Sequence, residues 1–209
     1  MKNLYFESME RALNYRKNGE NCLVHSFCAM NNHFHQTVSY LKGWERLSAT
    51  FQYGHGIFGA RFNRKTSRCG AVFSGRPKTP LIQNQAHERR VHFYVESNPI
   101  RAGICNYENL INYSYSSFGF YAHGKKTRYT SLLSIPQWYL QLARTWRARQ
   151  RRYRKLFELY LGLQDKKESS SFFDLYIGDD SWTEYEKKRV KKSMGNSEIV
   201  INMIKLESS

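Results

Sequence analysis

The chain has 209 residues, 41% of them hydrophobic and 24% charged, which is long enough for one hydrophobic core with an appendage. Its 33 Lys and Arg outnumber its 17 Asp and Glu, and the formal net charge of +16 points to a polyanionic partner, with nucleic acid as the first candidate. No stretch approaches about 18 uninterrupted apolar residues, so we expect no membrane partner.

The sequence carries four cysteines: Cys22, Cys28, Cys69 and Cys105. They form no CxxC motif and no disulfide-framework spacing, and the chain shows no signal-peptide pattern. We therefore expect reduced thiols in a cytoplasmic protein. A structural zinc site is disfavoured because neither Cys28 nor Cys105 has a usable ligand spacing.

The first predicted element is a short helix from Ser8 to about Arg16. Apolar residues at positions 9, 12 and 13 recur at helical spacing after a possible serine cap. The segment Lys17–Asn21 has turn chemistry and should end this helix.

The stretch Cys22–Leu41 carries the most informative pattern of the chain. Its alternation predicts a strand that breaks near Met30 and resumes with His33. Residues i and i+2 of a strand share a face, so His33 and His35 should project together while Phe34 faces the core. Two adjacent imidazoles supply half of a metal site; alternatively, they are a surface or hydrogen-bonded pair without a metal.

A longer helix is predicted to follow. Apolar residues from Trp44 to Phe62 recur at spacings that fit one helical face, although three glycines weaken it by about 1 kcal/mol each. We expect a turn at Arg68–Gly70 and a short strand at Ala71–Phe73. The basic loop Ser74–Lys78 can place backbone N–H groups and two cations on a phosphate, or it is an ordinary solvated turn.

The next predicted helix is capped by Asn84 and runs to about Ser97. Pro99 disfavours helical backbone at Asn98, so the helix should stop or kink there, and Asn98 taken alone could be an ordinary cap. Helical spacing predicts that four side chains share one face: His87, Arg90, Tyr94 and Asn98.

From Ser134 to about Leu163 the apolar register predicts one amphipathic helix or two joined end to end. Between Gln141 and Tyr160 seven Lys or Arg meet a single Glu, which favours nucleic-acid contact over a merely solvated face. The other face of this segment carries a basic stripe: Arg144, Arg147, Arg151 and Arg154. We expect a polar linker over 164–171, a smaller helical segment over 172–192, and little regular structure beyond 195.

Four segments occur in the order seen in IS200-like transposases: Met30–His35, Arg68–Arg76, Tyr94–Gly103 and Tyr113–Ser117. The chain most resembles the REP-associated tyrosine transposases, the single-tyrosine branch of the HUH endonucleases. The ordered combination is specific, whereas the His-x-His pair alone is not. The resemblance implies a catalytic domain over 1–122, with 123–163 as a basic helical extension and 164–209 as a linker with a small helical segment.

The resemblance implies an α+β fold with a ferredoxin-like antiparallel sheet and helices on one face. It implies that Tyr94 is the nucleophile and that His33, His35 and Asn98 ligate one Mg²⁺ or Mn²⁺. The implied substrate is single-stranded DNA beside a hairpin, and we expect a monomer or homodimer. Members of the family carry a strand ahead of the first helix. Here we expect that strand to be missing or shortened, which would expose the backbone groups of the neighbouring strand unless Asn3–Phe6 or a partner chain replaces it.

The implied chemistry is coherent. A phenol with a pKa near about 10 is a poor nucleophile at neutral pH. A metal can polarise the scissile phosphate, and attack by Tyr94 then gives a 5′-phosphotyrosine and a free 3′-OH. We expect ten basic side chains to contact the nucleic acid: Arg61, Arg64, Arg76, Lys78, Arg90, Arg101, Arg144, Arg147, Arg151 and Arg154.

Two other functions stay open at this point. One is a catalytically inactive regulator that binds DNA or RNA through its basic surface. The other is a hydrolytic metallonuclease that uses water, in which case the product 5′ ends are free rather than linked to the protein.

Overall fold

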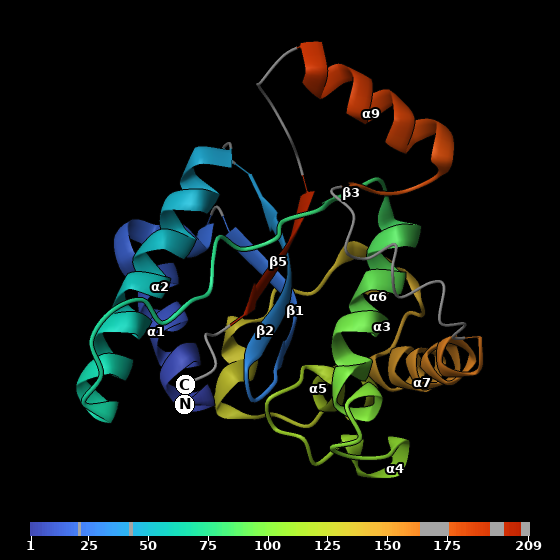
Figure 1. Cartoon of the computed structure of the whole chain (residues 1–209). Helices are drawn as coiled ribbons and strands as arrows, with labels where there is room; N and C mark the ends of the chain where they lie inside the picture. The colour runs from blue at the N-terminus through green and yellow to red at the C-terminus, as the bar shows by residue number, and fades with distance from the viewer. Residues whose placement is uncertain (21, 42–43, 164–175, 193–198, 206–209) are drawn as a thin grey trace.

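The fold is mixed α+β, with helices on both sides of a central sheet (Figure 1). The computed structural model describes residues 1–209 except 21, 42–43, 164–175, 193–198 and 206–209. No helix in the described part of the chain is both long and apolar enough to cross a membrane.

The sheet has five strands in the order β1-β2-β5-β3-β4. Its strands are β1 (Cys22–Ala29), β2 (His33–Tyr40), β3 (Leu81–Ile82), β4 (Tyr176–Ile177) and β5 (Ile199–Lys205). The neighbouring pairs are antiparallel, as expected, except β3 and β4, which are parallel. The predicted break near Met30 is confirmed: the backbone N–H of Met30 donates to His33 O at 2.8 Å and closes the β1–β2 hairpin.

The helices are α1 (Lys2–Asn14), α2 (Trp44–Thr66), α3 (Gln85–Arg101), α4 (Tyr107–Leu110), α5 (Phe118–His123), α6 (Gln137–Gln141), α7 (Trp146–Gly162) and α9 (Asp180–Lys192). Two short 3-10 helices are η1 (Tyr15–Glu20) and η2 (Arg128–Leu132). The segment from Ser134 to Leu163 therefore forms two helices, which is the second of the two predicted alternatives.

The first helix is longer than predicted. It starts at Lys2 rather than Ser8, and the Ser8 hydroxyl donates to Leu4 O at 2.7 Å within the helix, so Ser8 is not its cap. The predicted strand at Ala71–Phe73 is wrong: all three residues are described, and none belongs to a named strand.

One face of the sheet packs against α1 and α2. The Phe34 ring stacks on Tyr5 of α1 with 3.7 Å between ring centroids, and Phe58 of α2 meets Phe34 edge-on. The two helices lie close together at Gly54, where a Cβ atom would meet the sulfur of Met9 at 2.7 Å. Glycine at this position therefore permits the close packing of α1 and α2 despite its low helix propensity.

The other face of the sheet packs against α3, which brings Val91, Tyr94 and Val95 into a second apolar cluster. Helices α6 and α7 contribute to the same cluster, with Trp138 and Tyr153 among their buried side chains. The expectation of helices on one face only is wrong, because β1 and β2 carry buried side chains on both faces (Figure 1). The predicted extension over 123–163 packs into this cluster.

The sheet position beside β2 is filled by β5, the last strand in the described part of the chain. Asn3–Phe6 lie in α1, and β5 pairs with β2 from His33↔Lys205 to Ser39↔Ile199. The prediction of little regular structure beyond 195 is therefore wrong for 199–205. The β-branched and apolar residues of Ile199–Lys205 suit a strand, but their pairing partners lie about 160 residues away in the sequence.

Helix α3 continues through Pro99 to Arg101, so of the two predicted alternatives, a stop or a kink near Asn98, the stop is wrong. Proline has no N–H to donate to Val95 O, the acceptor one turn earlier. The Asn98 side-chain amide donates to that carbonyl at 3.2 Å and to Tyr94 O at 2.8 Å. The Val95 carbonyl therefore still accepts a hydrogen bond although Pro99 cannot donate one. The predicted cap at Asn84 is confirmed, since its side chain accepts from the N–H groups of Ala86 and His87.

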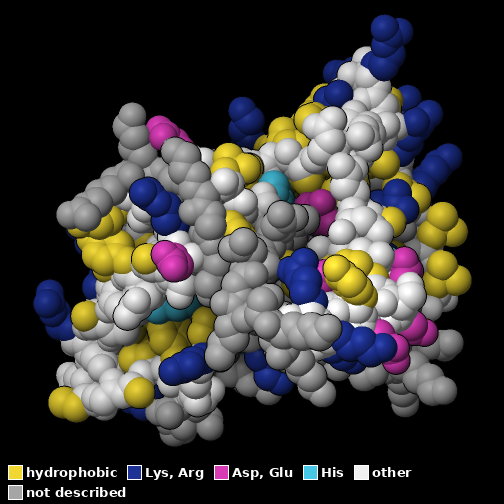
Figure 2. Space-filling model, turned by 90° about the horizontal axis from the view of Figure 1, so that it is seen from above, with side chains coloured by type: hydrophobic (Ala, Val, Ile, Leu, Met, Phe, Trp, Pro, Cys, Tyr) yellow, Lys and Arg dark blue, Asp and Glu magenta, His cyan; other side chains and the backbone are white. Residues whose placement is uncertain are grey.

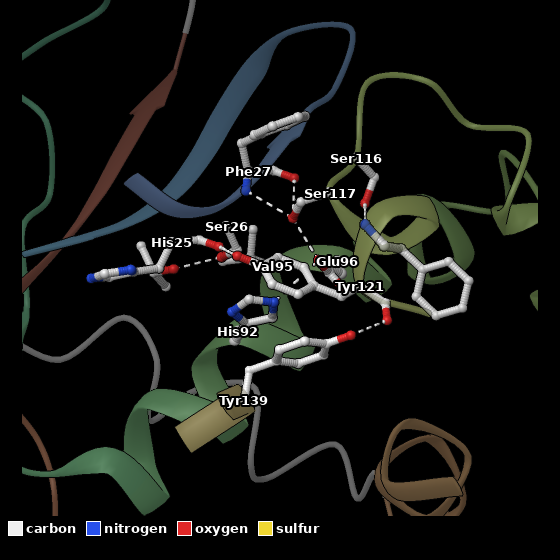
Figure 3. A network of polar contacts seen from close by, with 12 residues as sticks. His25, Ser26, Phe27, His92, Val95, Glu96, Ser116, Ser117, Tyr121 and Tyr139 are labelled. Atoms are coloured by element: carbon white, nitrogen blue, oxygen red, sulfur yellow. Dashed lines mark hydrogen bonds and ion pairs between the residues drawn. The ribbon is translucent and has the colours of Figure 1, made fainter. Parts of the chain in front are cut away.

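A fully buried carboxylate joins α3 to the rest of the fold. Glu96 accepts hydrogen bonds from Ser117 Oγ at 2.5 Å and from the Tyr153 hydroxyl, and His92 Nε2 lies 3.2 Å from Glu96 Oε1. Ser117 Oγ also accepts from the N–H of Phe27 (Figure 3). One carboxylate therefore links α3 to β1, to the start of α5 and, through Tyr153, to α7.

Replacing this carboxylate should destabilise the protein strongly. Glu96→Ala leaves the hydroxyls of Ser117 and Tyr153 without their common acceptor, and we expect a loss of about 3–5 kcal/mol in the free energy of unfolding. Urea denaturation followed by circular dichroism measures it. The control is Glu184→Ala, which removes an exposed ion pair with Lys188 and should change little. Equal stability of the two variants would contradict the account.

Candidate nucleophile and metal site

The two histidines of β2 lie side by side, as the strand alternation predicts. Their ring centroids are 4.8 Å apart, and Phe34 between them faces the opposite layer. His33 Nδ1 lies 2.7 Å from Asn32 Oδ1, an oxygen that can only accept, so Nδ1 carries the proton. In the neutral ring the lone pair is then on Nε2, the form in which a histidine binds a metal.

His35 is the buried member of the pair, with 4% of its surface exposed. Burial lowers its pKa to about 3, and the neighbouring His33 and Arg101 act in the same direction. Neither ring nitrogen has a hydrogen-bond partner within the described part of the chain. A buried polar atom without a partner costs about 1–3 kcal/mol, which a bound cation or water would offset.

Tyr94 of α3 lies against His35, the buried histidine of the pair. Its ring meets His35 edge-on, with 5.8 Å between ring centroids. Burial raises the pKa of Tyr94, whereas Arg101 lowers it, and the guanidinium carbon of Arg101 lies 5.2 Å from the centroid of the Tyr94 ring. The phenol is only 3% exposed, so a phosphate reaches it only after a side-chain rotation or a shift of the surrounding segments.

Asn98 lies one turn after Tyr94 on the same helix and is itself buried. Because its amide nitrogen donates to two carbonyls of α3, the amide oxygen is turned away from those carbonyls. The amide oxygen is a neutral donor suited to a divalent cation. Within the described residues, no group of three or more His, Cys, Asp or Glu side chains could hold a metal.

The predicted basic residues do not form a single surface. They lie on α2 (Arg61 and Arg64), on the segment after it (Arg76 and Lys78), on α3 (Arg90 and Arg101), and at or just before the start of α7 and along it (Arg144, Arg147, Arg151 and Arg154). Helices α2 and α7 lie on opposite sides of the sheet, and Figure 2 shows Lys and Arg side chains spread across the face in view.

Several of these cations have partners inside the protein, and Arg101 lies over the Tyr94 ring. Arg61 donates to Glu7 Oε2 at 2.8 Å, and Arg154 donates to the backbone carbonyl of Ala122. By contrast, Arg76, Arg147 and Arg151 are exposed, so a polyanion can reach them.

Sequence reasoning did not identify Asn32 as the partner of His33, nor Glu96 as the anchor of α3. The position of Asn32 directly before the His-x-His pair was an available signal. The burial of Glu96 could not be read from the sequence around it, because its partners Ser117 and Tyr153 come from distant segments.

No family model matches the chain, and searches of the curated proteins and of the solved structures find no match.

The burial of His35 predicts that its ring takes up a proton only at a pH well below the usual range, which nuclear magnetic resonance can follow in the metal-free protein. The folded-state pKa of about 3 lies below the ordinary value of 6.5, so His35 should stay neutral while the unfolded chain takes up a proton. The free energy of unfolding therefore falls as the pH drops from about 6.5 towards about 3, and His35→Gln should reduce this loss. A ring signal of His35 that titrates near the ordinary value would contradict the burial argument.

Proposed function

We propose that the protein is a metal-dependent endonuclease and strand transferase that nicks single-stranded DNA beside a hairpin through a 5′-phosphotyrosine. The observation that carries this proposal is the contact between the Tyr94 phenol and His35, whose ring nitrogens are buried without partners in the described residues. A nucleophile beside neutral metal-binding side chains is what phosphoryl transfer through a tyrosine requires. The order of the four family-like segments supports the same assignment.

The proposal includes a ferredoxin-like core of the HUH kind. Its support is the sheet order, in which β1, β2 and β3 come from the first half of the chain and β5 lies antiparallel between β2 and β3. In this proposal β5 takes the place of the N-terminal strand of the resembled family, and α1 and α2 cover one face of the core. Helix α3 then presents the nucleophile on the other face.

The reaction is an in-line exchange of phosphoesters. The Tyr94 Oη–phosphorus bond forms, the bond from phosphorus to the 3′ oxygen breaks, and that oxygen leaves with a proton as a 3′-OH. Arg101 stabilises negative charge on the phenol and on the phosphate near it. Because the phosphoester is kept on the protein, a 3′-OH can reverse the step and join strands without ATP.

The residues present fit a divalent metal. His33, His35 and Asn98 would hold it through two imidazole nitrogens and one amide oxygen. A bound Mg²⁺ or Mn²⁺ supplies Lewis-acid polarisation of the scissile phosphate. The mixed nitrogen and oxygen set suits Mn²⁺ better than Mg²⁺, which prefers oxygen ligands. Asn32 keeps His33 in the tautomer with its lone pair on Nε2.

The nucleophile is tested by Tyr94→Phe. We expect this variant to lose covalent attachment to a labelled single-stranded hairpin oligonucleotide, because the ring remains but the attacking oxygen is gone. Binding of the same oligonucleotide should change little. A denaturing gel with Mn²⁺ measures the adduct, and Tyr185→Phe, an exposed tyrosine of α9, is the control. An adduct formed equally by Tyr94→Phe would refute the assignment.

The metal ligands are tested by combining His33→Ala with His35→Ala. The double variant should lose Mn²⁺-dependent cleavage by at least about a hundredfold, as removal of a key electrostatic group does in enzymes. It should also lose Mn²⁺ binding measured by calorimetry, a readout that does not depend on activity. His123→Ala is the matched control. Undiminished cleavage and metal binding in the double variant would exclude these ligands.

The second candidate is a regulator that binds nucleic acid without breaking it. The burial of Tyr94 and the exposed cations on α7 favour this alternative. It predicts tight binding with a steep salt dependence and no metal-dependent cleavage by the wild type. A hydrolytic nuclease would instead cleave and leave free 5′ ends, which the same gel distinguishes from a protein-linked product.

A further inference from the structure

A cavity of about 740 Å³ lies between α2 and the segment 73–79. Val38 of β2 forms part of its wall and belongs to the same apolar cluster as Phe34, so the cavity is on the α1–α2 side of the sheet. Tyr94 lies on the other side. Val38 also follows His33 by five residues on β2, or roughly 17 Å of extended strand, so the cavity is separate from the candidate nucleophile site.

Aromatic rings form much of the cavity wall. The His55 ring centroid lies 5.0 Å from that of Phe73 and 5.6 Å from that of Phe51, and all three side chains line the space. His55 Nε2 is buried and has no hydrogen-bond partner within the described residues. Burial lowers the pKa of His55 to about 4, so its ring is neutral at pH 7 and Nε2 can serve a ligand as a donor or as an acceptor, according to the tautomer.

Charge adds a second requirement for the ligand. Arg76 lines the cavity and is exposed, whereas no Asp or Glu belongs to the described lining. The polar side chains of Ser48, Gln52 and Thr79 complete it. A ligand that suits these walls has a flat aromatic part with polar edges and a negative charge beside it. A nucleotide has all three features, and the volume lies within the range of small-molecule sites.

We propose that this cavity receives an unpaired base of a bound DNA single strand, with Arg76 on the adjoining phosphate. Proteins read single strands by splaying bases onto aromatic side chains and bonding their edges, and each base has a flat face for stacking. This inference rests on the proposed function, because it takes single-stranded DNA as the substrate. It places base recognition on the sheet face opposite to the one that carries Tyr94.

Binding assays test this inference independently of cleavage. The full-length Tyr94→Phe protein is titrated against fluorescent single strands of dT, of dA and of an abasic backbone of equal length. We expect at least about fivefold tighter binding of the strands that carry bases, since stacking of one base contributes on that scale. Ser48→Trp, added to the same protein, should fill the cavity and reduce the difference to less than about twofold. It should leave binding of the abasic backbone unchanged.

The matched control is Ala49→Trp, which introduces the same side chain at the next position of α2, an exposed residue outside this cavity. It should keep the preference for bases. The inference is overturned if the parent protein does not distinguish the abasic strand, or if Ser48→Trp retains the preference. Competition by free dAMP or dTMP as strong as that of the strands would overturn the assignment to strand-borne bases. Failure here with a normal Tyr94 adduct in the wild type would leave the proposed function intact.

Discussion

The burial of β2 on both faces is the constraint on which the site depends. Successive side chains of a strand point to opposite faces, so the stacking of Phe34 on Tyr5 directs His33 and His35 towards α3. A slip of one residue would put the histidines among the aromatic side chains of α1 and α2 and expose the wrong set to Tyr94. Packing of Phe34 therefore fixes which face carries the candidate chemistry.

Helix α3 holds the other half of the site through two devices. Glu96 is bonded to β1, α5 and α7 by way of Ser117 and Tyr153, which fixes the helix against the sheet. Asn98 supplies the donor that Pro99 lacks, so the helix continues and the Asn98 amide keeps a fixed orientation. The same bonds that stabilise α3 thus orient a candidate metal ligand one turn after the candidate nucleophile.

Local patterns predicted the local parts of this arrangement. Alternation around His33 and His35 predicted their common face, and the cap at Asn84 marked the start of α3. Features made by distant segments were not predictable in this way. The pairing of β5 with β2, the burial of Glu96 and the cavity beside His55 each join segments that are far apart in the sequence. Single-sequence periodicity carries no information on such contacts.

The most direct test of the central claim is the distance from a bound metal to Tyr94. A fluorine-labelled tyrosine at position 94 gives a ¹⁹F signal that Mn²⁺ broadens when the ion is nearby. The account predicts that stoichiometric Mn²⁺ removes this signal in the wild-type background and leaves it sharp when His33 and His35 are both alanine. A signal that stays sharp in both proteins, or broadens equally in both, would contradict a metal shared by the histidine pair and the phenol.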